Sequence, residues 1–176
     1  FLVLDGKKAE AFDSICYWPE DLFTPSGQTH AYKAVSGGKS FVVVNGKKSD
    51  AYDDVGRLAL SRDGTPAFPA KIDGCWHLVF GATRGPAFDQ IGIPVLNREG
   101  SACAYPARRD RTWRMVVGGK EGPEYRDVDP PRFSPDGKRV AYGAQKDWKH
   151  CIVTDQGEGE WFGQVGAPVW SPDSAH

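Results

Sequence analysis

A four-residue turn element recurs along the chain at a nearly constant spacing, and this periodicity constrains the fold more than any other feature of the sequence. The fourth residues of successive copies are 37, 36, 37 and 37 positions apart. Periods of roughly 20 to 50 residues are typical of solenoids, propellers and similar arrays. The five copies are Thr24-Pro25-Ser26-Gly27, Ser61-Arg62-Asp63-Gly64, Asn97-Arg98-Glu99-Gly100, Ser134-Pro135-Asp136-Gly137 and Ser171-Pro172-Asp173-Ser174.

Three further markers share this period. Ala-aromatic-x-Ala follows four of the turns, at Ala31–Ala34, Ala67–Ala70, Ala104–Ala107 and Ala141–Ala144. A Trp before an apolar run occurs at Trp76, Trp113 and Trp148, with Ser40 in this place in one repeat, and Phe1–Leu4 is a further copy without its Trp. An aromatic residue three positions before a β-branched one occurs at Phe12 and Ile15, Tyr52 and Val55, Phe88 and Ile91, Tyr125 and Val128, and Phe162 and Val165.

Each repeat has room for four short strands, A to D, separated by turn residues. In Ser-Pro-Asp-Gly the proline presets φ, the serine bonds the local backbone and the glycine takes a positive φ, which makes a hairpin. In the last full repeat we expect strand A at 131–133, strand B at 139–142, strand C at 151–154 and strand D around 162–165. The 21 glycines and 13 prolines agree with an all-β chain of short strands and tight turns.

A single four-stranded sheet cannot bury both of its faces, so copies must pack face to face, and a β-propeller is the closed solution. We therefore predict one all-β propeller domain over 1–176, with complete blades at about 20–55, 57–91, 93–128 and 131–165. Strands from 1–15 and 167–176 would share a fifth blade. Either the ring has five blades with one incomplete, or the chain is a fragment of a larger propeller.

Four elements carry a resemblance to a known family. Ser134-Pro135-Asp136-Gly137, Ala141–Ala144, Trp113–Val117 and Gly122–Tyr125 resemble the WD-like propeller repeats of the Tol-B type. The resemblance extends over the whole chain and implies a propeller fold. Such repeats occur in periplasmic scaffold proteins and in the gating propellers of prolyl oligopeptidases. The resemblance therefore implies a periplasmic or secreted location, and a cytoplasmic location stays open.

Charge and hydropathy remove several function classes. The 22 Lys+Arg balance the 23 Asp+Glu, so there is no basic footprint for nucleic acid. The longest apolar runs, such as Phe41–Val44, are far shorter than the roughly 20 residues that cross a bilayer, so we expect a soluble chain with no membrane insertion. The four cysteines lack metal-site spacing and are expected to be free and mostly buried thiols.

Motifs that could carry chemistry have simpler explanations. Ser36–Ser40 lacks the first glycine and the following helix of a phosphate-binding loop. Ser61–Thr65 is only loosely similar to a sialidase Asp-box, and the repeat turn accounts for it. The sequence has no Gly-x-Ser-x-Gly element, and no histidine has an evident serine or cysteine partner, so a serine hydrolase is disfavoured. The acidic segment 155–160 could hold calcium, but a solvated turn explains it as well. We expect no catalytic residue, no metal and no cofactor.

Two loop segments are the candidate binding residues. Arg108, Arg109 and Arg111 fall in a B–C loop and could bind a carboxylate or phosphate of a partner. The alternative is a solvated loop paired with acidic residues of the adjoining connection, at 127 and 129. Trp18, in a predicted D–A loop, is either an exposed anchor or an element of packing between blades.

The sequence therefore favours a non-catalytic propeller scaffold that binds a protein or peptide through loops on one face. The alternatives are an accessory or gating propeller of a hydrolase, such as an oligopeptidase, and a carbohydrate-binding propeller. If a blade stays open, its edges could pair two copies of the chain into a homo-oligomer.

Overall fold

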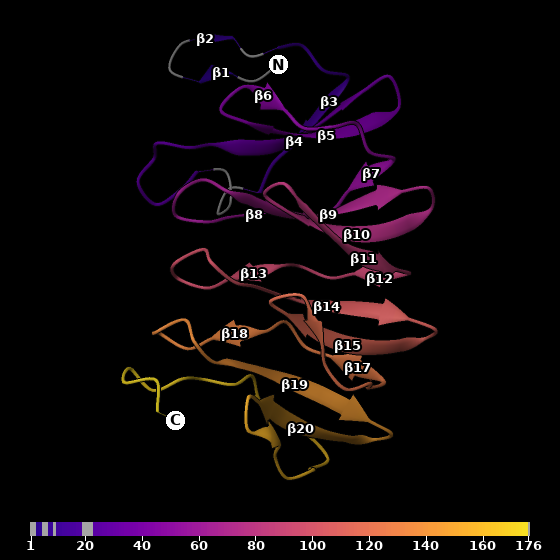
Figure 1. Cartoon of the computed structure of the whole chain (residues 1–176), viewed down its shortest axis with the longest axis vertical. Helices are drawn as coiled ribbons and strands as arrows, with labels where there is room; N and C mark the ends of the chain where they lie inside the picture. The colour runs from indigo at the N-terminus through magenta and orange to yellow at the C-terminus, as the bar shows by residue number, and fades with distance from the viewer. Residues whose placement is uncertain (1–2, 5–6, 9, 19–22, 176) are drawn as a thin grey trace.

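The computed structural model describes residues 3–4, 7–8, 10–18 and 23–175. In this part of the chain the secondary structure consists of strands, without helices, so none of it has a helix that could cross a bilayer. Four antiparallel sheets follow one another along the long axis in chain order (Figure 1). The predicted all-β fold with propeller-type repeats is confirmed.

Each sheet is built around a long central hairpin with short strands on either side, and the sheets are numbered here in chain order. Sheet 1 contains β3 (Ser14–Cys16), β4 (Ala31–Ser36), β5 (Lys39–Val44) and β6 (Lys47–Lys48). Sheet 2 contains β7 (Asp54–Val55), β8 (Ala59–Leu60), β9 (Pro66–Ile72), β10 (Cys75–Phe80) and β11 (Thr83–Phe88).

Sheets 3 and 4 repeat the arrangement of sheet 2. Sheet 3 contains β12 (Gln90–Ile91), β13 (Val95–Leu96), β14 (Cys103–Arg109), β15 (Thr112–Val117) and β16 (Lys120–Glu121). Sheet 4 contains β17 (Asp127–Val128), β18 (Arg132–Phe133), β19 (Val140–Lys146), β20 (Lys149–Thr154) and β21 (Gly157–Glu158). In each of these sheets strand A is a pair of two-residue strands that both pair with strand B, for example β12 and β13 with β14.

The sheets divide the chain a few residues earlier than the expected blade limits. Phe88 pairs with Trp76 in its own sheet, whereas Ile91 pairs with Ala107 of the following sheet. The aromatic residue of the fourth marker thus ends strand D of one sheet, and the β-branched residue begins strand A of the next. We expected this whole marker within strand D. Instead it spans the crossing between two sheets, because only its aromatic residue pairs with strand C of its own sheet.

The hydrophobic core lies between the sheets and uses both faces of strand B. Ala104 packs in one cluster with Tyr142 of sheet 4. Its neighbour Tyr105 and Ala107 pack in another with Ala67 of sheet 2. Because side chains alternate along a strand, the first alanine of the Ala-aromatic-x-Ala marker faces the following sheet, and the aromatic residue and second alanine face the preceding one. This alternation is why every repeat needs the whole marker.

One member of the tryptophan marker occupies a different place from the others. Trp76 and Trp113 lie in strand C, where they pair with strand B. In sheet 4 that register position belongs to His150, which pairs with Gln145. Trp148 comes two residues earlier, in the turn between strands B and C, and 77% of it is exposed. The sequence marker therefore groups Trp148 with two tryptophans that belong to strand C, although it lies in the preceding turn.

The turns between strands A and B stack on one another at one end of the sheets, on the left in Figure 1. We call this the A–B end. A Cβ on Gly64 would meet Thr29 at 2.7 Å, one on Gly100 would collide with Ser61, and one on Gly137 would meet Asn97 at 3.3 Å. Each turn therefore rests on the preceding one. The first residues of these turns are accordingly buried although they are polar: Thr24, Ser61, Asn97 and Ser134.

The two terminal segments lie at opposite ends of the stack (Figure 1). β1 (Val3–Leu4) and β2 (Lys7–Lys8) pair only with each other. The fifth copy of the turn, Ser171–Ser174, lies against sheet 4, where the Asp136 amide donates a hydrogen bond to Ser174 Oγ at 3.0 Å. Among the described residues no strand of one terminal segment pairs with the other, and the blade shared by 1–15 and 167–176 stays a prediction; residues 1–2, 5–6, 9, 19–22 and 176 lie outside the described residues.

Candidate functional site

The turns between strands B and C lie at the opposite end of the sheets from the A–B turns, on the right in Figure 1, and we call this the B–C end. Aspartates of the crossing segments support three of these turns. Gly37 donates its N–H to Asp13 Oδ2 at 2.8 Å in sheet 1, and Asp110 donates its N–H to Asp89 Oδ2 at 3.0 Å in sheet 3. In sheet 2 the Lys39 ammonium, followed by the backbone N–H groups of the turn, lowers the pKa of Asp53.

The fourth turn departs from this arrangement. Arg126 replaces the aspartate, and its Nη1 donates to the Asp147 carbonyl at 3.3 Å. Its guanidinium also stacks on the Trp148 ring, 4.5 Å from the centroid. A stacked guanidinium holds an indole in a fixed position while leaving its other face open. Sheet 4 thus presents a positioned aromatic ring where the other sheets carry a capped turn.

Each turn between strands B and C has two central residues, and the second of them also changes from sheet to sheet. Gly38 and Gly74 occupy this position in sheets 1 and 2, and nothing lies within 4 Å of a Cβ built on either. In sheet 3 the position is held by the exposed Arg111 at φ 70°, and in sheet 4 by Trp148. The positive φ of Arg111 costs a side chain about 1–2 kcal/mol, and residues of this kind cluster at functional sites, whereas Trp148 has no positive φ.

Arg109, predicted as a binding residue, is engaged within the protein. Its two terminal nitrogens bind the Glu121 carboxylate at 2.9 and 3.0 Å, and Nη2 also donates to the Ala87 carbonyl of sheet 2 at 3.1 Å. The guanidinium lies 4.4 Å from the centroid of Phe88. Arg114 shares the same carboxylate at 2.8 Å. The partner of Arg109 is Glu121 of the same sheet rather than the acidic residues at 127 and 129 that the sequence suggested.

The other two arginines of this segment differ from Arg109. The Arg108 guanidinium lies 5.8 Å from the centroid of Trp113, so it covers an aromatic ring of its own sheet. Arg111 is exposed at the tip of the turn. Of the predicted cluster, Arg111 is therefore the residue that extends from the surface.

Trp18 is not in a D–A loop. It follows β3 in the strand A segment of sheet 1, is partly buried, and packs against the core cluster between sheets 1 and 2. The Trp18 side chain thus packs between two sheets, which is one of the two alternatives that the sequence left open.

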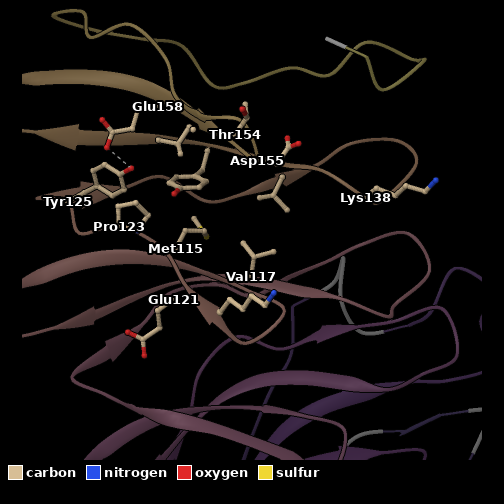
Figure 2. A pocket seen from close by; sticks show the side chains of 15 residues that line it. Met115, Val117, Glu121, Pro123, Tyr125, Lys138, Thr154, Asp155 and Glu158 are labelled. Carbon is tan, nitrogen blue, oxygen red and sulfur yellow. Dashed lines mark hydrogen bonds between the residues drawn. The ribbon is translucent and has the colours of Figure 1, made fainter.

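A cleft opens between sheets 3 and 4 on the side of the A–B end, with a volume of about 420 Å³ (Figure 2). Met115 and Val117 lie in its middle, with Lys138 and Asp155 toward one side and Tyr125 with Glu158 toward the other.

Tyr125 donates a hydrogen bond to Glu158 Oε1 at 3.0 Å across the two sheets. Burial, then the neighbouring Tyr142 and then Glu158 raise the pKa of Tyr125, so the phenol stays protonated and acts as a donor.

The remaining candidates for chemistry are occupied by structural contacts. Asp155 of the acidic segment binds Arg139 Nε at 2.8 Å. His77 Nδ1 contacts the Gly85 carbonyl at 2.9 Å. Within 3–4, 7–8, 10–18 and 23–175 no group of His, Cys, Asp and Glu side chains could hold a metal.

The cysteines are free, but only half of them are buried, fewer than expected: Cys103 and Cys151 are buried, whereas Cys16 and Cys75 are exposed. Burial raises the pKa of Cys103 to about 12, which leaves this thiol unreactive.

Sequence reasoning missed Arg126 and Trp148 as a pair. The signal was present in the crossing segments, where Asp13, Asp53 and Asp89 align with Arg126. The charge at this repeat position changes from negative to positive in one repeat, and the adjacent turn of that repeat contains Trp148. These two features together would have identified the pair.

Comparison with known proteins gives fold-level similarity. No family model matches the chain, and no curated protein matches its sequence. Among solved structures, TolB from Acinetobacter baumannii is 17% identical with a TM-score of 0.49, over 75% of this chain and 39% of that one. Kluyveromyces lactis Hsv2 is 17% identical with a TM-score of 0.41, over 84% of this chain and 50% of that one.

The Dos1 propeller is 9% identical with a TM-score of 0.41, over 79% of this chain and 56% of that one. The chain thus spans between about two fifths and just over half of the length of these proteins. At such identities and TM-scores, these similarities say nothing about ligands. The chain is an all-β protein of propeller-type sheets that resembles TolB-like and other WD-like β-propellers.

Proposed function

We propose that this chain is a non-catalytic propeller scaffold that binds a protein or peptide partner through its B–C end. Rigid stacked sheets position the turns, and loops on a rigid framework are where binding residues concentrate. The proposal concerns the surface formed by Arg111, Arg126 and Trp148, which we call the B–C patch.

One observation carries the proposal. Two large side chains, Arg111 and Trp148, stand at a turn position that is glycine in sheets 1 and 2. Trp148 is 77% exposed, so it contributes little to the core. Tryptophan and arginine are the residues most enriched among those that dominate binding energy at protein interfaces. The backbone strain at Arg111 and the solvent exposure of Trp148 bring no gain in core packing, which favours a role in binding.

The chemistry of the patch defines its partner. The two guanidinium groups suit carboxylates of a partner, and the open face of the Trp148 indole suits an apolar or aromatic side chain. We expect a peptide segment that combines acidic residues with one aromatic or large aliphatic residue.

Panning a random phage-displayed peptide library on the immobilised chain tests this function. We expect enriched peptides with this composition, and fluorescence polarisation should give an affinity that Trp148→Ala weakens more than tenfold. Gln156→Ala, an exposed change in the C–D turn of sheet 4, is the matched control and should leave the affinity unchanged. A library that yields no enriched peptide, or peptides that bind Trp148→Ala equally well, would refute the proposal.

A further inference from the structure

The cleft between sheets 3 and 4 has two counterparts in the stack, and the comparison among them suggests a second binding site. The cleft between sheets 1 and 2 measures about 780 Å³ and that between sheets 2 and 3 about 250 Å³, against about 420 Å³ here. The repeat places Val42, Leu78 and Met115 at the same position in the three clefts. Their apolar floors are therefore alike, and their polar groups distinguish them.

The three clefts differ in charge. The lining of the cleft between sheets 2 and 3 has no charged side chain and carries Thr83 and Ser101 at its edge. The cleft between sheets 1 and 2 has Lys47, Lys48 and Asp50, and Lys48 is bound to a glutamate at 2.8 Å. The cleft between sheets 3 and 4 has five charged residues: Lys120, Glu121, Lys138, Asp155 and Glu158.

The acidic groups of this cleft already have partners. Glu121 binds Arg109 and Arg114, at 2.9 and 2.8 Å. Asp155 binds Arg139 at 2.8 Å, and Glu158 accepts the hydrogen bond of a tyrosine at 3.0 Å. Two of the three carboxylates are thus neutralised by arginines, whereas Glu158 keeps its negative charge because the phenol that binds it is neutral.

The two lysines are in the opposite situation. Neither the Lys120 nor the Lys138 ammonium forms an ion pair or hydrogen bond with any residue that the structure describes. The carboxylate closest to Lys138 in sequence, Asp136, is held by the Ser134 hydroxyl at 2.6 Å and by the Lys138 backbone N–H at 3.1 Å. The cleft thus combines an apolar floor with two lysine ammonium groups that form no hydrogen bond with a described residue, of which that of Lys138 attracts the Asp136 carboxylate.

We infer that the cleft between sheets 3 and 4 binds a small amphipathic carboxylate. Its apolar chain or ring would lie on Met115, Val140 and Tyr142, and its carboxylate would face Lys120 and Lys138. Ligand sites of about 300–1000 Å³ with mostly apolar walls and a few polar groups are typical for such molecules. The volume of this cleft lies toward the lower end of that range, as for a medium-chain acid.

Decanoate is the probe for the test, with titration calorimetry as the primary measurement on the full chain. We expect one decanoate per chain and an affinity that falls more than tenfold in Lys120→Glu/Lys138→Glu. Lys146→Glu/Lys149→Glu at the B–C end is the control with the same charge change and should bind as the original chain does. Equal affinity of the double variant and the original chain would overturn the site.

Decanol separates the role of the charge from that of the apolar floor. We expect decanol to bind at least tenfold more weakly than decanoate, and the difference to shrink in the double lysine variant. Equal affinities for decanol and decanoate would overturn the assignment of a carboxylate. Because both substituted lysines are on the surface, the melting temperature should be unchanged, which identifies lost binding as a local effect. Trp148→Ala should leave decanoate binding intact, so this site and the B–C patch fail independently.

Discussion

The two ends of the stack use the same kind of tight turn under different constraints. At the A–B end each turn rests on the one before it, and the Asn97 amide donates to the Gly137 carbonyl of the next turn at 3.2 Å. At the B–C end no neighbour lies within 4 Å of a Cβ built on Gly38 or Gly74. One end is therefore a packed column and the other is a row of separate loops. At the packed end, steric contacts between turns restrict which residues fit. At the open end, the position that is glycine in sheets 1 and 2 accommodates the large side chains of Arg111 and Trp148.

The largest expected effect is at the packed end. Gly100→Ala introduces a Cβ that would collide with Ser61, at a residue with φ of 71°. Overpacking and the left-handed backbone together should lower the free energy of unfolding by about 2–4 kcal/mol. Gly74→Ala, at φ 84° with open space around it, should lower it by only about 1 kcal/mol. Urea denaturation of both variants measures the difference, and equal losses would contradict a packed column.

A smaller loss is expected from the polar contacts between packed turns. Asn97 also donates to Ser101 Oγ at 3.1 Å and accepts the Ala102 N–H at 3.0 Å. Asn97→Ala leaves these groups without their partner and should cost about 1–3 kcal/mol. Asp89→Ala removes the single exposed hydrogen bond to a B–C turn and should cost about 0.5–1 kcal/mol. If Asp89→Ala proved as damaging as Asn97→Ala in the same urea measurement, the contrast between the two ends would be wrong.

The open end should gain stability when its unusual residue is removed. Arg111→Gly relieves a left-handed side-chain position and is expected to raise the free energy of unfolding by about 0.5–1 kcal/mol. The same substitution should weaken binding of the peptides selected by panning. Calorimetric melting and fluorescence polarisation on one preparation test both parts. A variant that loses stability would indicate that Arg111 has a structural role.

Trp148→Ala should change stability still less. The ring is 77% exposed and its main contact is the stacked Arg126, so we expect a change within about 0.5 kcal/mol. Trp76→Ala is the comparison, because Trp76 packs against the core cluster between sheets 2 and 3 and its truncation should cost more. Comparable losses in urea denaturation would mean that Trp148 supports the fold.

Acid should weaken the packed end gradually. The serine hydroxyls at the start of three A–B turns hold the pKa of Asp63, Asp136 and Asp173 below the usual value. A lowered pKa in the folded state stabilises the protein above the unfolded-state pKa of about 3.9, and this contribution is lost as the pH falls through the folded-state pKa. The melting temperature should therefore drop below about pH 4. Asp136→Asn should flatten this drop, and an unchanged pH profile in that variant would exclude the turn as its source.

Much of the fold follows from the spacing of a few residues. The turn elements Ser61–Gly64, Asn97–Gly100 and Ser134–Gly137 form hydrogen-bonded turns where the repeat places them. The Ala-aromatic-x-Ala segments form the B strands. Local chemistry suffices for these features, because turn geometry and strand alternation involve residues close in sequence. The candidate site was less predictable, since the same reasoning singled out Arg109 and Trp18, whose side chains are engaged in contacts within and between the sheets.

The amino-acid sequence by itself determined the repeat, the strand content and the identity of the turn residues. The tertiary structure decided which side chains are free. Arg109 is bound to Glu121, Trp18 is packed between sheets, and Trp148 is exposed in a turn. The physical reason is that exposure and pairing depend on the register of one sheet against the next, which residues far apart in sequence set together.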